Sequence, residues 1–240
     1  MINNYYPGTP ARNFMETGFN ETFAAVLRRV YVWMTLGLLV TAGTAAFVSV
    51  SPLFQLLAGQ PLIFLVLMIA ELGLVVGLSW GINRLAPATA MLLFFLYAIL
   101  NGLTFSVLFV VYTLGSVAST FVATAALFGV MSILGYTTKL DLSRVGSFLF
   151  MGLIGLLIAM LVNMFWTNTI LGWIITFAGI LIFLGLTFYD TQRIKRMTAT
   201  ALQQGDENVQ ARMGILGALS LYLDFINLFL FILRLGGRRR

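Results

Sequence analysis

Long apolar runs separated by short polar breaks dominate this chain, and the runs have the length of membrane spans. A helix needs about 20 mostly apolar residues to cross the roughly 30 Å hydrocarbon core of a bilayer. Seven windows meet this requirement, at about residues 30–50, 62–82, 88–112, 116–137, 145–166, 169–191 and 213–235. The pattern predicts an all-α, polytopic membrane protein with seven transmembrane helices.

Turn-forming or charged residues separate the apolar windows. The longest hydrophilic segment, Thr191–Arg212, is predicted to be a loop. Residues 1–28 are predicted to form a polar cytoplasmic tail, 29–235 the membrane domain and 236–240 a basic C-terminal tail. No apolar signal core precedes Thr22, so we expect the first span to act as an uncleaved signal-anchor.

Basic residues predict the orientation, because Lys and Arg are enriched in short cytoplasmic loops. Ten of them lie before span one or in every second connection: Arg12, Arg28, Arg29, Arg84, Lys139, Arg144, Arg193, Lys195, Arg196 and Arg212. The alternate connections, 51–61, 112–116 and 166–169, contain no Lys or Arg. This places the N-terminus in the cytoplasm of a bacterial inner membrane protein. The arginines at 234 and 238–240 depart from this pattern, because they follow the seventh span. Either the last segment re-enters and returns to the cytoplasm, or the tail crosses the membrane against the preference of basic residues for the cytoplasm. We favour seven full spans.

Composition narrows the class of protein further. The chain is 60% hydrophobic and 9% charged, whereas soluble domains carry about 25% charged residues. Cysteine and histidine are absent, which excludes thiol nucleophiles, imidazole bases and histidine-bound zinc or haem. The net charge of +6 comes from basic residues in short loops beside the spans, so it does not indicate nucleic-acid binding. We therefore expect no enzyme, no cofactor, and the lipid bilayer as a partner.

Three carboxylates interrupt the apolar spans: Glu71, Asp190 and Asp224. An ionisable group at membrane depth costs about 2.5–3.5 kcal/mol on insertion scales, so such residues usually have a partner or a function. Spans six and seven are joined on the cytoplasmic side, so Asp190 and Asp224 can meet if span six continues through Gln192 to Arg196 or if span seven starts later than Met213. Two carboxylates in a low-dielectric pocket share a proton, and their oxygens suit Ca²⁺. Ser220 and Asn227 share the helix face of Asp224.

Four other polar residues are weaker candidates. Glu71 in span two is a candidate pore-lining residue, and its alternative is a protonated acid bonded across a helix interface. Asn101 and Asn163 are also candidate pore-lining residues, although amides in spans more often bridge helices. Arg84 is a candidate cytoplasmic latch for Asp190, and its alternative is a charge that sets topology.

Several stretches resemble the Bax inhibitor-1 (transmembrane BAX inhibitor motif) family, most closely its bacterial members. They are Tyr-Asp-Thr-Gln at 189–192, Leu-Tyr-Leu-Asp-Phe-Ile-Asn-Leu-Phe at 221–229, Gly-Tyr-Thr-Thr-Lys-Leu-Asp-Leu-Ser at 135–143 and the aliphatic run 148–163. The resemblance covers the chain from about Arg28. It implies a seven-helix bundle with the last helix at its centre, and a pH-sensitive calcium leak governed by Asp190 and Asp224. It maps an acidic pore residue onto Glu71, while the family's arginine latch has only Arg84 as a nearby counterpart. Bacterial relatives also include a partner of a membrane-bound protease.

Two function classes other than a calcium leak fit the same residues. One is a non-conducting regulator that binds a membrane protease or a stress-response partner. The other is an intramembrane aspartyl protease, because two aspartates sharing a proton supply that chemistry. Those enzymes carry Gly-x-Gly-Asp, and the sequence here is Leu221-Tyr-Leu-Asp224, which argues against this class.

Overall fold

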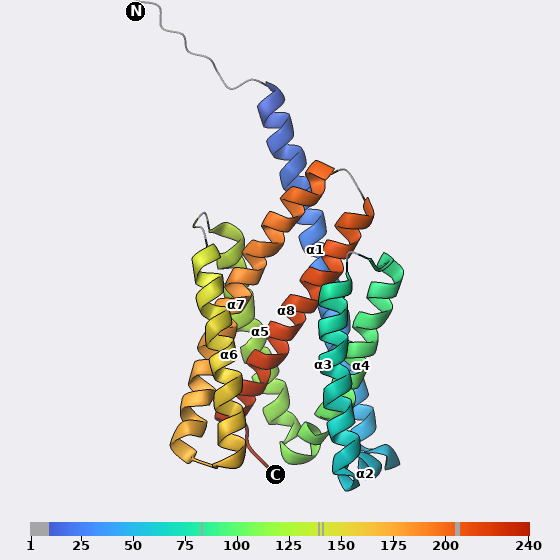
Figure 1. The fold of residues 1–240 in the computed structure, drawn as a ribbon, viewed down its shortest axis with the longest axis vertical. Helices are drawn as coiled ribbons and strands as arrows, with labels where there is room; N and C mark the ends of the chain where they lie inside the picture. The colour runs from blue at the N-terminus through green and yellow to red at the C-terminus, as the bar shows by residue number, and fades with distance from the viewer. Residues whose placement is uncertain (1–9, 83, 139, 141, 205–206) are drawn as a thin grey trace, which may run out of the picture.

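The computed structural model consists of eight helices and describes residues 10–240 except 83, 139, 141 and 205–206. Within helices, it leaves the side chains of 10–23, 143, 200–204 and 207–208 undescribed. The helices are α1 (Pro10–Ser49), α2 (Pro52–Gly59), α3 (Pro61–Gly81), α4 (Pro87–Val111), α5 (Leu114–Thr137), α6 (Ser143–Phe165), α7 (Thr169–Gln204) and α8 (Glu207–Gly236) (Figure 1).

Seven of these helices are long and apolar enough to cross a membrane, which confirms the predicted class and number of spans. The spans are Ala24–Ser49, Pro61–Gly81, Pro87–Val111, Leu114–Thr137, Arg144–Phe165, Thr169–Ala199 and Val209–Gly236. The eighth helix, α2, has eight residues and fills the first non-cytoplasmic connection. Prolines at the starts of α2, α3 and α4 set these boundaries, because the first turn of a helix does not need the missing N–H.

The predicted loop at Thr191–Arg212 is wrong, since most of it is helical. α7 continues to Gln204 and α8 begins at Glu207. Hydrophilic composition suggested a loop, but the segment contains no glycine or proline before Gly205. It is also amphipathic, because Ile194 and Thr198 are each 2% exposed, one turn apart. Packing of that face keeps α7 helical beyond its apolar run.

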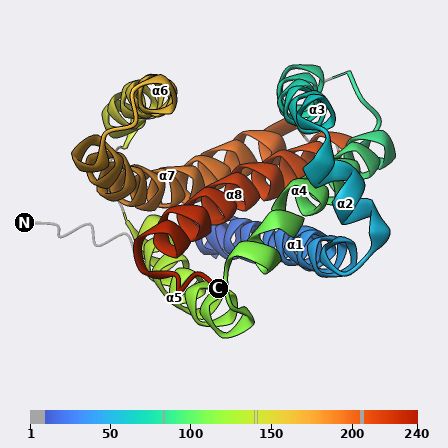
Figure 2. The same cartoon turned by 90° about the horizontal axis from the view of Figure 1, so that it is seen from below.

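α8 is the central helix of the bundle. It packs against α1, α4, α5 and α7, and 67% of its most apolar 18-residue window is buried, at least twice the share in any other span. Figure 2 shows it between α7 on one side and α1, α4 and α5 on the other. The two outer helices are α3, which packs on α4, and α6, which packs on α7. The central position explains why this helix tolerates polar residues: they face protein rather than lipid.

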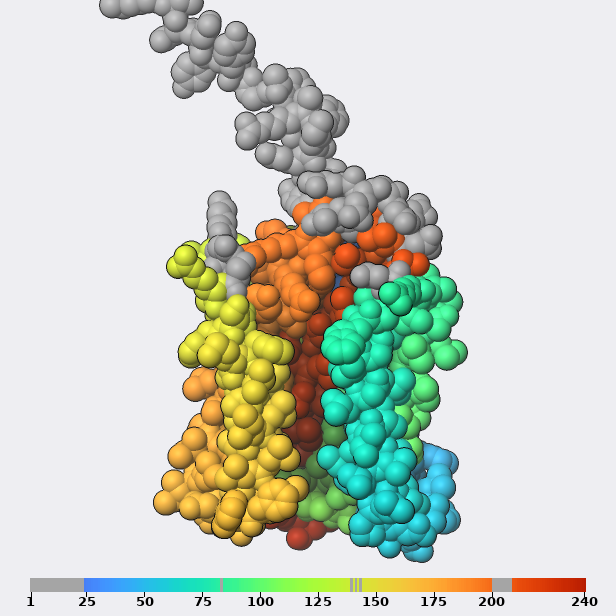
Figure 3. Space-filling view, viewed as in Figure 1, coloured from blue at the N-terminus to red at the C-terminus, as the bar shows by residue number. Residues whose placement is uncertain are grey.

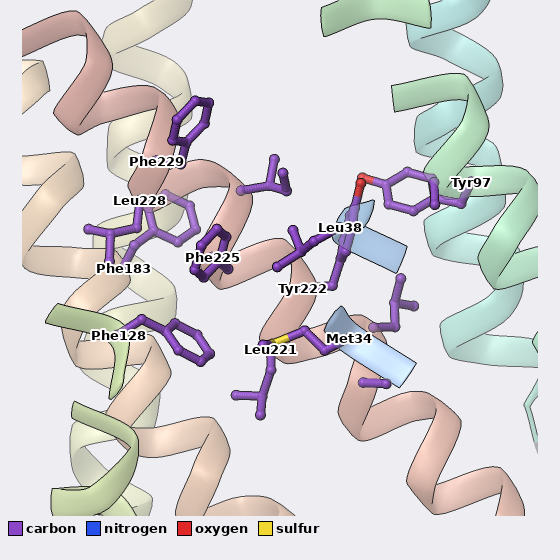
Figure 4. Packing of buried hydrophobic residues seen from close by; sticks show 14 of the residues in the cluster. Met34, Leu38, Tyr97, Phe128, Phe183, Leu221, Tyr222, Phe225, Leu228 and Phe229 are labelled. Carbon is purple, nitrogen blue, oxygen red and sulfur yellow. The ribbon is translucent and has the colours of Figure 1, made fainter. Parts of the chain in front are cut away.

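Aromatic rings fill the space around α8. Tyr222 is fully buried, and its ring meets those of Phe94 and Tyr97 edge-on, with centroids 5.7 and 5.8 Å apart. On another side of α8, Phe225 packs against Phe128 (Figure 4). These contacts fix the rotation of α8 about its own axis, and thereby the direction in which its polar residues point.

One face of α8 remains only partly covered. Its half-buried residues recur at helical spacing and form a single stripe: Met213, Leu216, Ser220, Leu223, Asn227 and Leu230. In Figure 3 this helix forms the floor of a furrow between α3 and α6. We call this furrow the α8 groove. It exists because α3 and α6 pack on different neighbours of α8.

The C-terminal tail lies at the end of the bundle opposite to the α7–α8 connection (Figure 1). It pairs with the α4–α5 turn through an antiparallel bridge between Tyr112 and Arg239. The backbone N–H of Thr113 donates to the Arg238 carbonyl (3.1 Å), and that of Arg240 to the Val111 carbonyl (2.9 Å). α8 therefore runs the whole length of the bundle rather than turning back, and with the predicted cytoplasmic N-terminus the arginine tail falls on the non-cytoplasmic side.

Cysteine labelling tests this topology, since the natural chain has no cysteine. We expect Arg240→Cys to react with a membrane-impermeant maleimide in intact spheroplasts. The matched control Glu207→Cys, at the first residue of α8, is expected to react only after the membrane is permeabilised. Labelling of both variants, or of Glu207→Cys alone, in intact spheroplasts would contradict the orientation.

Candidate functional site

The Tyr-Asp-Thr-Gln stretch on α7 contacts three different parts of the bundle. Tyr189 packs directly on Gly146 of α6. Thr191 is fully buried beside Gly135 of α5. Gln192 receives a bond from the Leu142 backbone N–H (3.2 Å) and donates to the Leu140 carbonyl (2.6 Å), which fastens the α5–α6 connection to α7. Asp190 is left as the residue of this stretch that faces α8.

Asp190 is 13% exposed and has one close basic neighbour among the described residues. The Arg193 Nη1 atom lies 4.0 Å from the Asp190 Oδ1 atom, one turn along the same helix. The Ser220 hydroxyl of α8 donates a hydrogen bond to the Asp190 carboxylate. Asp190 is thus held between a half-exposed arginine on its own helix and a hydroxyl on the central helix.

Asp224 lies one helical turn beyond Ser220 and is 4% exposed. Within the described part of the chain, its Oδ2 atom is buried without a hydrogen-bond partner. The charge of Asp190 acts on Asp224 across the α7–α8 interface. A buried carboxylate with an unsatisfied oxygen beside a second carboxylate is costly when both are ionised.

The extension of α7 brings the two aspartates to similar depth. Asp190 lies 14 residues before the last residue of α7, and Asp224 lies 17 residues after the first residue of α8. At about 1.5 Å per residue, these separations correspond to roughly 21 and 26 Å from the α7–α8 connection. From the sequence, this match required either a longer sixth span or a later start of span seven. The structure has the longer α7, whereas α8 starts earlier than predicted, at Glu207.

Two cavities flank the aspartate pair along the α8 groove. A cavity of about 210 Å³ reaches α8 at Arg212, Met213 and Leu216, on the cytoplasmic side of the pair. A second one, of about 170 Å³, is lined by α6, α7 and α8 and reaches Asn227, Leu230 and Arg234 on the other side. Ser220 and Asp224 lie between these two sets of residues on α8. The aspartate pair therefore lies in the part of the α8 groove that separates the two cavities.

The groups at this segment are oxygen ligands, which suit a hard cation. Asn227 follows Asp224 by one turn, and its amide nitrogen donates to the Leu223 carbonyl (2.8 Å), which leaves the amide oxygen to accept. No third acidic residue joins the pair within the described chain. Two carboxylates and an amide are fewer oxygens than the six to eight that Ca²⁺ takes, so the arrangement suits a passing, partly hydrated ion better than a resident one.

Glu71 belongs to a separate polar cluster on the opposite face of α8. The Thr104 hydroxyl of α4 donates to Glu71 Oε1 (2.5 Å). The Tyr222 hydroxyl bonds Thr41 Oγ1 of α1 (2.7 Å), and the Glu71 charge acts on both Tyr222 and Tyr97. Tyr222 and Asp224 are two residues apart, which places them about 200° apart around the helix. Glu71 is half-buried between α3 and α4.

The remaining candidate residues lie away from the aspartate pair. Asn101 is buried on α4, and its amide nitrogen donates to the Tyr97 carbonyl (3.2 Å) of the same helix. Asn163 accepts a bond from the Asn168 backbone N–H (3.1 Å) at the non-cytoplasmic end of α6. Arg84 is exposed in the α3–α4 turn, and the described residues contain no ion pair between it and Asp190. The basic neighbour of Asp190 is Arg193.

Sequence reasoning missed the polar partners of Glu71. Thr41, Tyr97, Thr104 and Tyr222 each interrupt an apolar run, and that interruption is the signal that could have pointed to them. Hydroxyl groups are common inside spans because they bond to their own helix backbone, as Thr187 and Thr191 do here. A hydroxyl that bridges two helices cannot be told from these by sequence.

The fold defines the class: a multi-pass membrane protein with seven apolar spans, the last of which is the central helix and carries the polar residues of the groove. The family described as "Inhibitor of apoptosis-promoting Bax1" matches residues 24–240. The chain belongs to this family, the Bax inhibitor-1 family, which confirms the resemblance seen in the sequence.

Bacterial relatives match along nearly the whole chain. The chain is 48% identical to "Inner membrane protein YbhL" of Escherichia coli over 215 residues, which cover 89% of this chain and 92% of the relative. It is 43% identical to an uncharacterized protein of Rickettsia prowazekii over 230 residues, covering 93% and 95%. A membrane protein of Streptococcus pyogenes is 38% identical over 231 residues, covering 93% and 95%. The inner membrane assignment of the first relative agrees with the seven apolar spans.

Proposed function

We propose that this protein is a pH-sensitive cation leak with Ca²⁺ as the transported ion, gated by the proton that Asp190 and Asp224 share. The observation that carries the proposal is the position of the pair, between two cavities on the partly covered face of α8. Titration of the pair changes its charge in the segment that separates the cavities. A local charge change that biases the packing of two helices is a sufficient switch.

The surroundings of the pair support a change in α7–α8 packing rather than a rigid channel. The pair is bounded on α7 by Arg193 and on α8 by Ser220. When one carboxyl is protonated, it can donate to the other, and the helices remain close. When both are ionised, they repel each other and attract a cation, whose charge offsets theirs.

The structure gives less support to an aspartyl protease. α8 is helical from Glu207 to Gly236, through Asp224. A protease of that class must present extended substrate backbone to its two carboxyls. Tyr222 and Phe225, on either side of Asp224, are packed in the core rather than open to a substrate strand.

Calcium flux into liposomes tests the proposal. Purified protein is reconstituted with a Ca²⁺-sensitive dye inside the vesicles, and influx is followed in a series of buffers from acid to neutral pH. We expect influx above that of protein-free liposomes and a clear change of rate across the series. No influx above the protein-free rate would instead favour a non-conducting regulator that acts through a membrane protease or another partner.

A further inference from the structure

A polar cavity of about 650 Å³ opens at the non-cytoplasmic end of the bundle, far from the aspartate pair. It is formed by the end of α6, the start of α7, the end of α8 and the C-terminal tail, and its lining includes Asn163, Thr169, Trp173, Thr176, Arg234 and Arg239. Two arginines, several hydroxyls and two amides in one cavity are unusual for a chain that is 60% hydrophobic. Arg234 also lines the cavity beside Asn227, whereas the other lining residues take no part in the proposed cation leak.

Nitrogen donors converge on the wall of this cavity over Gly172. A Cβ atom at this position would lie 3.2 Å from Arg234 Nη2 and 3.9 Å from Asn163 Nδ2. The Asn163 oxygen already accepts the Asn168 backbone N–H, so its amide nitrogen is the atom left to donate. Glycine keeps the space in front of both donors open.

The arginines around this cavity face a surface without carboxylate side chains. The eight acidic residues of the chain are Glu16, Glu21, Glu71, Asp141, Asp190, Asp206, Glu207 and Asp224. They precede span one, lie within spans or belong to cytoplasmic connections, and none lies in the non-cytoplasmic segments 50–60, 112–113, 166–168 and 237–240. Arg239 stacks over the Tyr112 ring (6.0 Å to its centroid), which fixes it without neutralising it.

We propose that this cavity binds a phosphate-bearing anion at the non-cytoplasmic surface, with Arg234 and Arg239 as the charged contacts and Asn163 as a neutral donor. Guanidinium groups bind phosphate through two parallel hydrogen bonds, which favours arginine over lysine for this purpose. The ligand is the phosphate of an anionic phospholipid headgroup or a free phosphate in the periplasm. Trp173, half exposed at the mouth of the cavity, lies at the depth where aromatic residues meet headgroups.

The site gives a role to two of the four arginines at this end of the chain, Arg234 and Arg239. Backbone bonds between the tail and residues 111–113 hold Arg239 beside α8. Arg238 directly precedes Arg239 in the tail, and its backbone N–H donates to Ser116 Oγ (2.9 Å), but its side chain does not line the cavity. It is therefore a matched control for the two lining arginines.

Binding measurements on the full-length purified protein test the proposal. Native mass spectrometry compares retention of phosphatidylglycerol and phosphatidylethanolamine, and isothermal titration in the same detergent measures inorganic phosphate. We expect one of the two phosphate sources to bind, and binding to fall about tenfold in Arg234→Gln and in Arg239→Gln. Arg238→Gln, which removes the same charge from the same tail, is expected to bind as the natural protein does.

A charge-neutral variant separates the site from a general effect of net charge. Gly172→Ala places a methyl group in front of the Arg234 guanidinium, and we expect it to weaken binding severalfold while the protein still folds. Selective retention of phosphatidylglycerol identifies a lipid headgroup, and titration by phosphate alone identifies a soluble anion. Equal binding by all three arginine variants, or no binding of either phosphate source by the natural protein, would overturn the proposal.

Discussion

Asp224→Asn is expected to abolish the pH dependence of Ca²⁺ influx in liposomes. The asparagine amide has nearly the same shape as the carboxyl but carries no titratable proton, so the shared-proton equilibrium is lost. Asp224 is 4% exposed, and its Oδ2 atom has no hydrogen-bond partner among the described residues. We therefore expect no solvent-exposed group to take over its titration in the variant. We expect a flat rate across the series from acid to neutral pH, where the natural protein shows a clear slope.

The partner substitution gives the proposal its sharpest test. If the proton belongs to the pair, Asp190→Asn is also expected to flatten the profile, and the double variant is expected to be no flatter than either single variant. Coupled groups show this non-additivity, whereas independent groups add their effects. Ser220→Ala removes the hydrogen bond to Asp190 and is expected to displace the profile along the pH axis without flattening it.

Controls for this experiment come from carboxylates outside the pair. Glu207→Gln removes one negative charge at the start of α8 and is expected to leave the profile unchanged. Glu71→Gln acts on the cluster with Thr104, on the opposite face of α8, and is expected to keep the pH dependence. A profile that stays steep in Asp224→Asn, or flattens equally in Glu207→Gln, would show that the gate lies elsewhere.

Gly135→Leu is expected to destabilise the bundle by at least about 2 kcal/mol, because overpacking a close helix contact forces the backbones apart. A Cβ atom at Gly135 would lie 2.5 Å from the Phe188 carbonyl oxygen and 3.0 Å from Thr191 Cβ. The first of these is a backbone atom, which cannot turn away as a flexible side chain does. Phe188 and Thr191 flank Asp190 on α7, so the same substitution displaces one member of the pair.

Gly129→Leu on the same helix is the matched control. A Cβ atom at Gly129 meets nothing within 4 Å, so the larger side chain extends into the lipid. Thermal unfolding in detergent is expected to show a clear loss of stability for Gly135→Leu and little change for Gly129→Leu. Equal stability of the two variants would mean that α5 and α7 do not approach as closely as the structure places them.

Sequence reasoning predicted the two aspartates as candidates but not all of their surroundings. Asp190 and Asp224 stood out because ionisable residues are costly inside apolar runs. Ser220 was placed on the face of Asp224 by helical periodicity alone. The cavities on either side of the pair depend on which side chains α3, α6 and α7 present. Helix packing decides which side chains line these cavities, and a local sequence pattern does not contain that information.

Apolar length, which follows from the bilayer thickness, predicted the seven spans, and the basic residues predicted the orientation. The family could be read from the sequence because the motifs around the two aspartates are local. The tertiary structure decided what these residues face. Helix periodicity left the rotation of α8 open, and the packing of Tyr222 and Phe225 fixed it, with the aspartates toward α7 and the Tyr222–Thr41 cluster on the far side. It also decided that Thr191–Arg212 is mostly helical, since burial of Ile194 and Thr198 outweighs a hydrophilic composition. The arginine tail, which contradicted the charge pattern, lies where the backbone of residues 111–113 holds it.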